Sequence, residues 1–223
     1  MQKLDGNVLS GNCLPARSGA AKSMVVFLHG YGANGDDLLS IGEDWAEALP
    51  DTAFLAPNAP DVCEMSALGY QWFSIRAIDN KAFEREKQMH KAVPVLNAFI
   101  DEQLRRWGVR EDKLVVAGFS QGAMMAMYTM PRRKTACAGV IGYSGLLVDA
   151  AGLQEGGIVK MPVLAIHGDA DEVVPPRFLG EVQGGFEAAG FNVETVMRPG
   201  LGHGIDGFGV MRGLDFTKEV LEK

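Results

Sequence analysis

The chain has 223 residues, 47% of them hydrophobic and 22% charged, which suits one globular domain over residues 1–223 with a core of ordinary size. Its net charge of −7 argues against nucleic acid and against an anionic membrane surface as partners. The three cysteines are scattered without metal-ligand spacing, and no apolar run resembles a signal peptide or is long enough to span a bilayer. We therefore expect a cytoplasmic protein without a metal, a cofactor or a transmembrane helix, and its oligomeric state is not readable from the sequence.

The N-terminal part of the chain predicts a buried strand, a helix and a second strand. Residues 1–23 carry few apolar positions and predict an edge hairpin or an irregular segment. Residues 24–28 read Met-Val-Val-Phe-Leu, and such an apolar, β-branched run is typical of a strand buried on both faces. The next predicted elements are a glycine-rich loop, a helix and a short strand, over residues 29–36, 37–49 and 52–56.

Residues 57–82 form the longest stretch without a helical or strand period. Prolines and a glycine interrupt it, yet it contains several large apolar side chains. Because long irregular loops in compact domains are usually functional, we predict a long loop close to the functional site.

The rest of the chain alternates helices with short apolar strands. A long amphipathic helix over 83–107 carries its apolar residues on one stripe and ends at Gly108. Strands are then predicted over 114–117, 136–143, 161–166 and 192–197, and helices over 123–130, 176–189 and 206–221. This alternation predicts the α/β class, with a mostly parallel sheet and helices on both of its faces.

The segment Gly118-Phe119-Ser120-Gln121-Gly122 lies between a predicted strand and a predicted helix. In this context Gly-x-Ser-x-Gly forms a nucleophile elbow, where a sharp turn exposes the serine hydroxyl at the end of the strand. Both glycines are needed because side chains on either side of so tight a turn would collide. The alternative is an ordinary buried serine in a tight turn.

Side chains that follow the strands predict the partners of Ser120, because ligands of such sheets bind beyond the carboxyl ends of the strands. Asp169 and Asp171 follow one strand and His203 follows the last, in the order Ser, Asp, His that α/β-hydrolases use. An imidazole would take the serine proton, and a carboxylate would orient the imidazole. The glycine-rich setting favours His203 over the other histidines, although a solvent-exposed turn histidine is the alternative. Position alone does not separate the two aspartates.

An oxyanion formed on the substrate would need two N–H donors. The backbone N–H of Gln121, at the start of a helix, is one candidate. The other is the backbone N–H of Tyr31, in the glycine-rich loop after the first buried strand. The glycines of that loop also have a simpler explanation, which is a tight turn into the helix.

Five motifs in order resemble the phospholipase/carboxylesterase family, which includes acyl-protein thioesterases and bacterial carboxylesterases. They are Phe27-Leu28-His29-Gly30-Tyr31-Gly32, Gln71-Trp72-Phe73-Ser74, the elbow, His167-Gly168-Asp169-Ala170-Asp171 with Val174-Pro175, and Gly202-His203. The resemblance runs from about residue 24 to the C-terminus and implies a single-domain α/β-hydrolase fold. It implies that Asp171 is the catalytic acid, and it supports Ser120 and His203 with the N–H groups of Tyr31 and Gln121.

The leading hypothesis is a serine hydrolase that cleaves small carboxylic esters of short to medium acyl chains, with thioesters or lysophospholipids as further substrates, through a Ser-His-Asp triad and an acyl-enzyme. A catalytically silent scaffold that binds a ligand or partner is one alternative, and a peptidase or lactonase is another. Met65, Leu68, Trp72 and Phe73 are predicted to wall the acyl groove. Their simpler role is to pack the 57–82 loop against the core, and this explanation has at least equal weight for Trp72 and Phe73.

Overall fold

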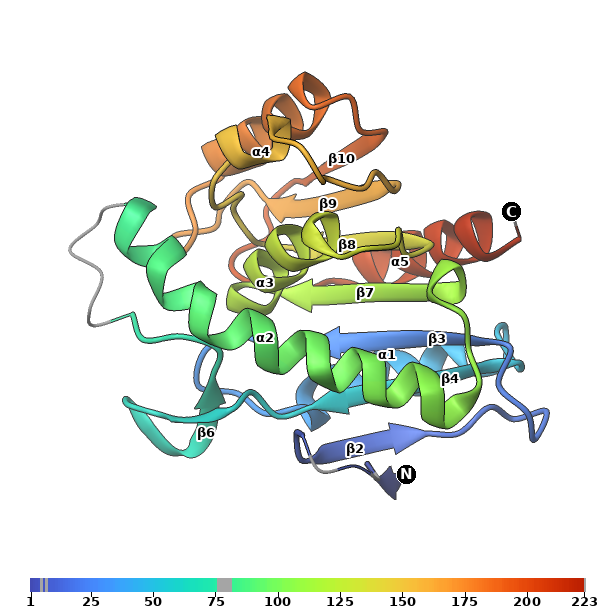
Figure 1. Cartoon of the computed structure of the whole chain (residues 1–223). Helices are drawn as coiled ribbons and strands as arrows, with labels where there is room; N and C mark the ends of the chain where they lie inside the picture. Colours follow the sequence, from blue (N-terminus) through green and yellow to red (C-terminus); the bar gives the residue numbers. More distant parts are fainter. Residues whose placement is uncertain (5, 7, 76–81, 223) are drawn as a thin grey trace.

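The computed structural model describes residues 1–4, 6, 8–75 and 82–222 (Figure 1). Within these residues, an eight-stranded sheet runs through the molecule in the order β1-β2-β4-β3-β7-β8-β9-β10. From β4 to β10 every neighbouring pair is parallel, and β2 pairs antiparallel with β1 and with β4. The strands are β1 (Gln2–Lys3), β2 (Gly11–Leu14), β3 (Ser23–Leu28), β4 (Thr52–Pro57), β7 (Leu114–Phe119), β8 (Gly139–Tyr143), β9 (Val163–Gly168) and β10 (Val193–Arg198).

Helices cover both faces of this sheet (Figure 1). On one face, α1 (Asp36–Trp45) and α5 (Gly207–Leu221) contribute their apolar side chains to one core cluster. On the other, α2 (Ala82–Trp107), α3 (Gln121–Thr129) and α4 (Arg177–Ala188) contribute to a second. The short 3₁₀ helices are η1 (Glu111–Lys113), η2 (Met130–Arg132) and η3 (Ala151–Gln154). The predicted fold class, α/β with a mostly parallel sheet between helices, is confirmed.

Burial on both faces explains why the central strands are so easily read from the sequence. All six residues of β3 are buried, as are the first five of β7, so apolar side chains dominate both strands. The one polar side chain among them, Ser23, forms a hydrogen bond with the Thr52 hydroxyl. On α2, the apolar stripe puts Met89, Leu96 and Phe99 in the core without exposure. Gly108 then ends the helix with a φ of 66°, a conformation that favours glycine.

The segment predicted as a long loop contains a hairpin instead. Strands β5 (Asp61–Cys63) and β6 (Ser66–Gln71) pair antiparallel, with an irregular register between Val62 and Cys63. Most side chains of this hairpin are exposed, so no alternation of apolar and polar residues marks its strands. Residues 76–81 of the predicted loop lie outside the described part of the chain.

Candidate active site

Ser120 lies at the sharp turn between β7 and α3. Its φ of 53° and ψ of −115° are a strained conformation for a residue with a side chain. The turn requires its two glycines: a Cβ on Gly118 would lie 2.3 Å from backbone atoms of Gly122, and a Cβ on Gly122 would lie 1.9 Å from the Leu28 carbonyl oxygen. The predicted elbow geometry is therefore present.

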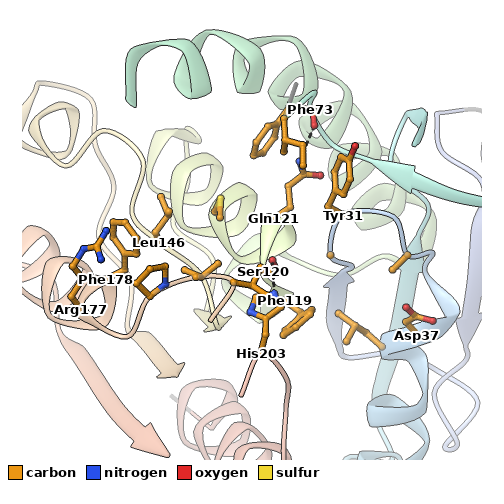
Figure 2. Close-up of a pocket in the computed structure, with 18 residues that line it drawn as sticks. Tyr31, Asp37, Phe73, Phe119, Ser120, Gln121, Leu146, Arg177, Phe178 and His203 are labelled. Carbon is orange, nitrogen blue, oxygen red and sulfur yellow. Dashed lines mark hydrogen bonds between the residues drawn. The ribbon is translucent and has the colours of Figure 1, made fainter. Parts of the chain in front are cut away.

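The side chains of Ser120, His203 and Asp171 form a continuous line of hydrogen bonds. His203 Nε2 lies 3.0 Å from Ser120 Oγ (Figure 2). On the other side of the ring, His203 Nδ1 lies 2.8 Å from Asp171 Oδ2. They follow β7, β10 and β9, three strands whose carboxyl ends meet at one edge of the sheet. This is the nucleophile, base and orienting acid arrangement that hydrolysis of an acyl compound needs.

Asp171 is held as a buried carboxylate. Its Oδ1 accepts hydrogen bonds from the backbone N–H groups of Val173 (2.9 Å) and Val174 (2.8 Å). Burial alone would raise the pKa of the Asp171 carboxyl, but the hydrogen bonds from His203, Val174 and Val173 outweigh it and lower the pKa. The Asp169 carboxylate points elsewhere: it accepts the Gly200 N–H at 2.6 Å and so stabilises the turn after β10.

The other three histidines form hydrogen bonds away from Ser120. His90 Nε2 lies 2.7 Å from the Tyr128 hydroxyl. His167 Nε2 lies 2.8 Å from the Val174 carbonyl oxygen and 3.3 Å from Asp171 Oδ2, the same oxygen that His203 Nδ1 contacts. His29 is fully buried in the loop after β3.

His29 fixes the peptide group that carries the Tyr31 N–H. The backbone N–H of Ala59 donates to His29 Nε2 at 2.9 Å, which leaves Nδ1 as the protonated nitrogen that donates to the Gly30 carbonyl oxygen at 2.7 Å. That carbonyl and the Tyr31 N–H belong to one planar peptide unit, so holding the first also orients the second. Burial lowers the pKa of His29 and keeps its ring neutral, against smaller opposing effects of Gly30 and Asp37.

The two predicted oxyanion donors lie at the same cavity as Ser120. Tyr31 and Gln121 both line it (Figure 2). In the described part of the chain, neither backbone N–H donates a hydrogen bond to another group. Both donors are therefore available to a ligand beside Ser120 Oγ.

A cavity of about 640 Å³ opens over Ser120, within the range usual for small-molecule sites. Its wall is mostly apolar and includes Phe73, Phe119, Met124, Leu146, Val174, Pro175 and Phe178. Of the side chains predicted to form the groove, Phe73 alone lines this cavity. The other three lie elsewhere, which corrects the prediction.

Met65 and Leu68 point into solvent from the β5–β6 hairpin, with 65% and 90% of their surface exposed. Trp72 is 1% exposed and belongs to the core, where its indole N–H donates to the His29 carbonyl oxygen at 3.0 Å. Met65 and Leu68 lie away from the cavity because they belong to the hairpin, whose backbone pairs with itself and leaves most of its side chains in solvent.

The family model described as phospholipase/carboxylesterase matches residues 14–221. The chain belongs to the phospholipase/carboxylesterase family. The predicted family and its α/β-hydrolase fold are confirmed, and this member of the phospholipase/carboxylesterase family is a carboxylic ester hydrolase.

Its relatives include solved and curated proteins. The crystal structure of esterase PE8 is 40% identical to the chain and has a TM-score of 0.91, over 96% of this chain and 99% of that one. Acyl-protein thioesterase 1 of Neurospora crassa is 28% identical over 195 residues, which are 80% of this chain and 79% of that protein. Arabidopsis thaliana SOBER1 shares the fold at 23% identity, with a TM-score of 0.79 over 90% of this chain and 100% of that one.

Two features of this phospholipase/carboxylesterase site escaped sequence reasoning. The Gln121 side chain, 3% exposed, binds the backbone of Trp72 and Phe73. Leu146 and Val174 line the cavity from the loops after β8 and β9. The rule that sites form beyond strand ends, which already pointed to Asp169 and Asp171 after β9, could also have pointed to the loop after β8. Among the described residues, no cluster of His, Cys, Asp and Glu is arranged to hold a metal ion, and no helix combines the length and apolar character needed to cross a bilayer.

Proposed function

We propose that the chain hydrolyses small carboxylic esters and thioesters through a covalent intermediate on Ser120. The observation that carries this proposal is the line of hydrogen bonds from Ser120 Oγ through His203 to Asp171, placed at the apolar cavity. A serine hydroxyl is a weak nucleophile until a base takes its proton, and His203 Nε2 is within hydrogen-bonding distance of it.

In the first half-reaction, Ser120 Oγ attacks the carbonyl carbon while His203 Nε2 takes the hydroxyl proton. The carbonyl oxygen becomes an oxyanion that accepts hydrogen bonds from the backbone N–H groups of Tyr31 and Gln121. The bond to the leaving group then breaks, and His203 gives its proton to the departing alcohol or thiol. Asp171 stabilises the imidazolium that exists between these two transfers.

In the second half-reaction, water attacks the acyl group on Ser120 and gives a proton to His203. His203 returns this proton to Ser120 Oγ as the carboxylic acid leaves. The apolar wall of the cavity suits an acyl chain of short to medium length. The cysteines Cys13, Cys63 and Cys137 are buried as thiols, and on this basis we infer that the protein acts in a reducing compartment, the cytoplasm.

A fluorophosphonate probe and a series of p-nitrophenyl esters test the proposal. The wild-type protein should be labelled and should turn over the esters, whereas Ser120→Ala should lose labelling and several orders of magnitude of turnover. Ser66→Ala, on the exposed face of the hairpin, is the matched control and should retain both. A folded wild-type protein that cleaves no ester or thioester would indicate a silent binding scaffold, and labelled Ser120→Ala would place the nucleophile elsewhere.

A further inference from the structure

The cavity over Ser120 extends to both sides of the serine, and its two ends differ in charge. Leu146, Phe178 and Arg177 lie on one side of Ser120 (Figure 2). We call this side, lined by these three residues, the Arg177 arm. Asp37 lies on the opposite side (Figure 2). The apolar wall thus leads from Ser120 towards the permanently charged guanidinium of Arg177, and the carboxylate of Asp37 lies at the other end of the cavity.

Arg177 differs from many arginines of this protein in having no acidic partner in the part of the chain that the structure describes. It is the first residue of α4 and is exposed at the cavity. Among the described residues, no carboxylate lies within ion-pair distance of it, although Glu181 follows one helical turn later. By contrast, ion pairs hold Arg110, Arg132, Arg133, Arg198 and Arg212.

The guanidinium of Arg177 lies over the ring of its neighbour Phe178, 4.7 Å from the ring centroid. This contact favours a fixed position for the cation at the wall of the cavity. The five N–H donors of a guanidinium remain suited to a carboxylate, which they can bind in a bidentate manner.

We propose that the Arg177 arm selects esters and thioesters whose acyl chain ends in an anionic group, such as monoesters of dicarboxylic acids. This proposal rests on the proposed function of Ser120. The methylene groups would contact Leu146 and Phe178, and the terminal carboxylate would meet Arg177. Asp37 would repel an anion at the other end, so the two charges would set the direction in which the substrate lies.

The acyl part fits this arm better than the leaving group for a chemical reason. The acyl chain stays attached to Ser120 until water releases it, so its contacts can act in both half-reactions, whereas the leaving group departs after the first. Arg177 is exposed, so the gain for an anionic chain should be modest, roughly fivefold in kcat/KM, and should shrink as salt is added.

Matched substrate pairs give the test. The p-nitrophenyl monoesters of adipic, suberic and sebacic acids are compared with the esters of hexanoic, octanoic and decanoic acids, with spontaneous hydrolysis subtracted. The readout is the ratio of kcat/KM for the anionic ester to that for the neutral ester of equal length. A loss of folded protein cancels in this ratio, because both substrates meet the same variant.

Arg177→Gln should lower the ratio roughly fivefold at low ionic strength for chains that reach the arginine, and Arg177→Lys should recover part of it. Arg110→Gln removes one positive charge from an exposed residue paired with Asp112, and it should leave the ratio unchanged. An equal ratio in wild type and Arg177→Gln would overturn the proposal, as would an equal fall in Arg110→Gln. Failure of the wild-type protein to cleave either kind of ester would instead contradict the proposed function.

Discussion

The side-chain amide of Gln121 holds the backbone of Trp72. Its Oε1 accepts the Trp72 N–H at 2.8 Å, and its Nε2 donates to the Phe73 carbonyl oxygen at 2.8 Å. One side chain thereby joins the residue after Ser120 to the segment that supplies Phe73 to the cavity wall. Gln121 therefore contributes in two ways: its backbone N–H is a proposed oxyanion donor, and its side-chain amide supports the cavity wall.

Gln121→Ala should destabilise the protein, because the Trp72 N–H and the Phe73 carbonyl lose their buried partner. The unfolding free energy should fall by about 2–6 kcal/mol in urea titrations, since each of the two unsatisfied groups costs about 1–3 kcal/mol. Gln121→Glu can still accept from Trp72 but places an anion beside the Phe73 carbonyl, so it should also be destabilised. A Gln121→Ala protein as stable as the wild type would show that water replaces the amide.

Replacing Ser120, the proposed nucleophile, by glycine should stabilise the fold. Ser120 has a φ of 53°, which glycine adopts without the strain that a Cβ brings. Ser120→Gly and Ser120→Ala should both be inactive, but the glycine variant should be more stable than the alanine variant by about 1 kcal/mol. Thermal unfolding of the two variants measures the difference, and the reverse order would mean that the elbow is not strained.

The two aspartates after β9 should separate by activity. Asp171→Asn replaces the carboxylate that accepts from His203 Nδ1, and turnover should fall by roughly 10⁴-fold if a wrongly held tautomer has the effect known in serine proteases. Asp169→Asn keeps an oxygen that can accept the Gly200 N–H, so it should cost far less. Steady-state kinetics of both variants decide the assignment, and the opposite ranking would transfer the acid role to Asp169.

Acyl-chain length should depend on the cavity wall and not on the hairpin. Each buried methylene contributes about 0.8 kcal/mol, so kcat/KM should rise up to roughly fourfold per carbon until the cavity is full. Leu146→Trp adds bulk to the wall and should shorten the preferred chain. Leu68→Trp is the matched control on the exposed hairpin and should leave the chain-length profile unchanged. A shortened profile in the Leu68 variant would show that substrates reach the hairpin.

Acid should destabilise the protein in part through His29. Its folded-state pKa lies below the value of about 6.5 in an unfolded chain, so its contribution is complete above pH 6.5 and is lost as pH falls towards the folded pKa. In that window one such group changes the unfolding free energy by up to about 1.4 kcal/mol per pH unit. Urea titrations at several pH values should give His29→Asn a smaller pH slope than the wild type. Equal slopes would contradict a buried neutral imidazole.

The sequence predicted those parts of the molecule in which burial or catalytic chemistry restricts the choice of amino acid. The apolar run of β3 is recognisable in the sequence because both faces of the strand are covered and few polar residues are tolerated. Ser120 and His203 stand out because strand ends meet at one edge. Asp169 and Asp171 could not be separated by position, since both follow β9 and both carboxylates accept backbone N–H groups.

The hairpin and the cavity wall were harder for a different physical reason. Strands β5 and β6 satisfy their hydrogen bonds with each other and with the loop around Gly32, so their side chains show no core-facing pattern. The wall is assembled from residues that are distant in sequence, such as Phe73, Leu146 and Phe178. Only folding brings these residues together, so no local pattern in the sequence predicts that they share a cavity wall.

The placement of the site also ties the chemistry to the folding of the whole sheet. The groups around Ser120 follow β3, β7, β9 and β10, so contacts between residues far apart in sequence must all form before the serine has its proposed base and oxyanion donors. During refolding, reactivity towards a fluorophosphonate should therefore appear with the last parallel strand and not with early collapse. The reactivity of Ser120 would thus report when the whole sheet has formed.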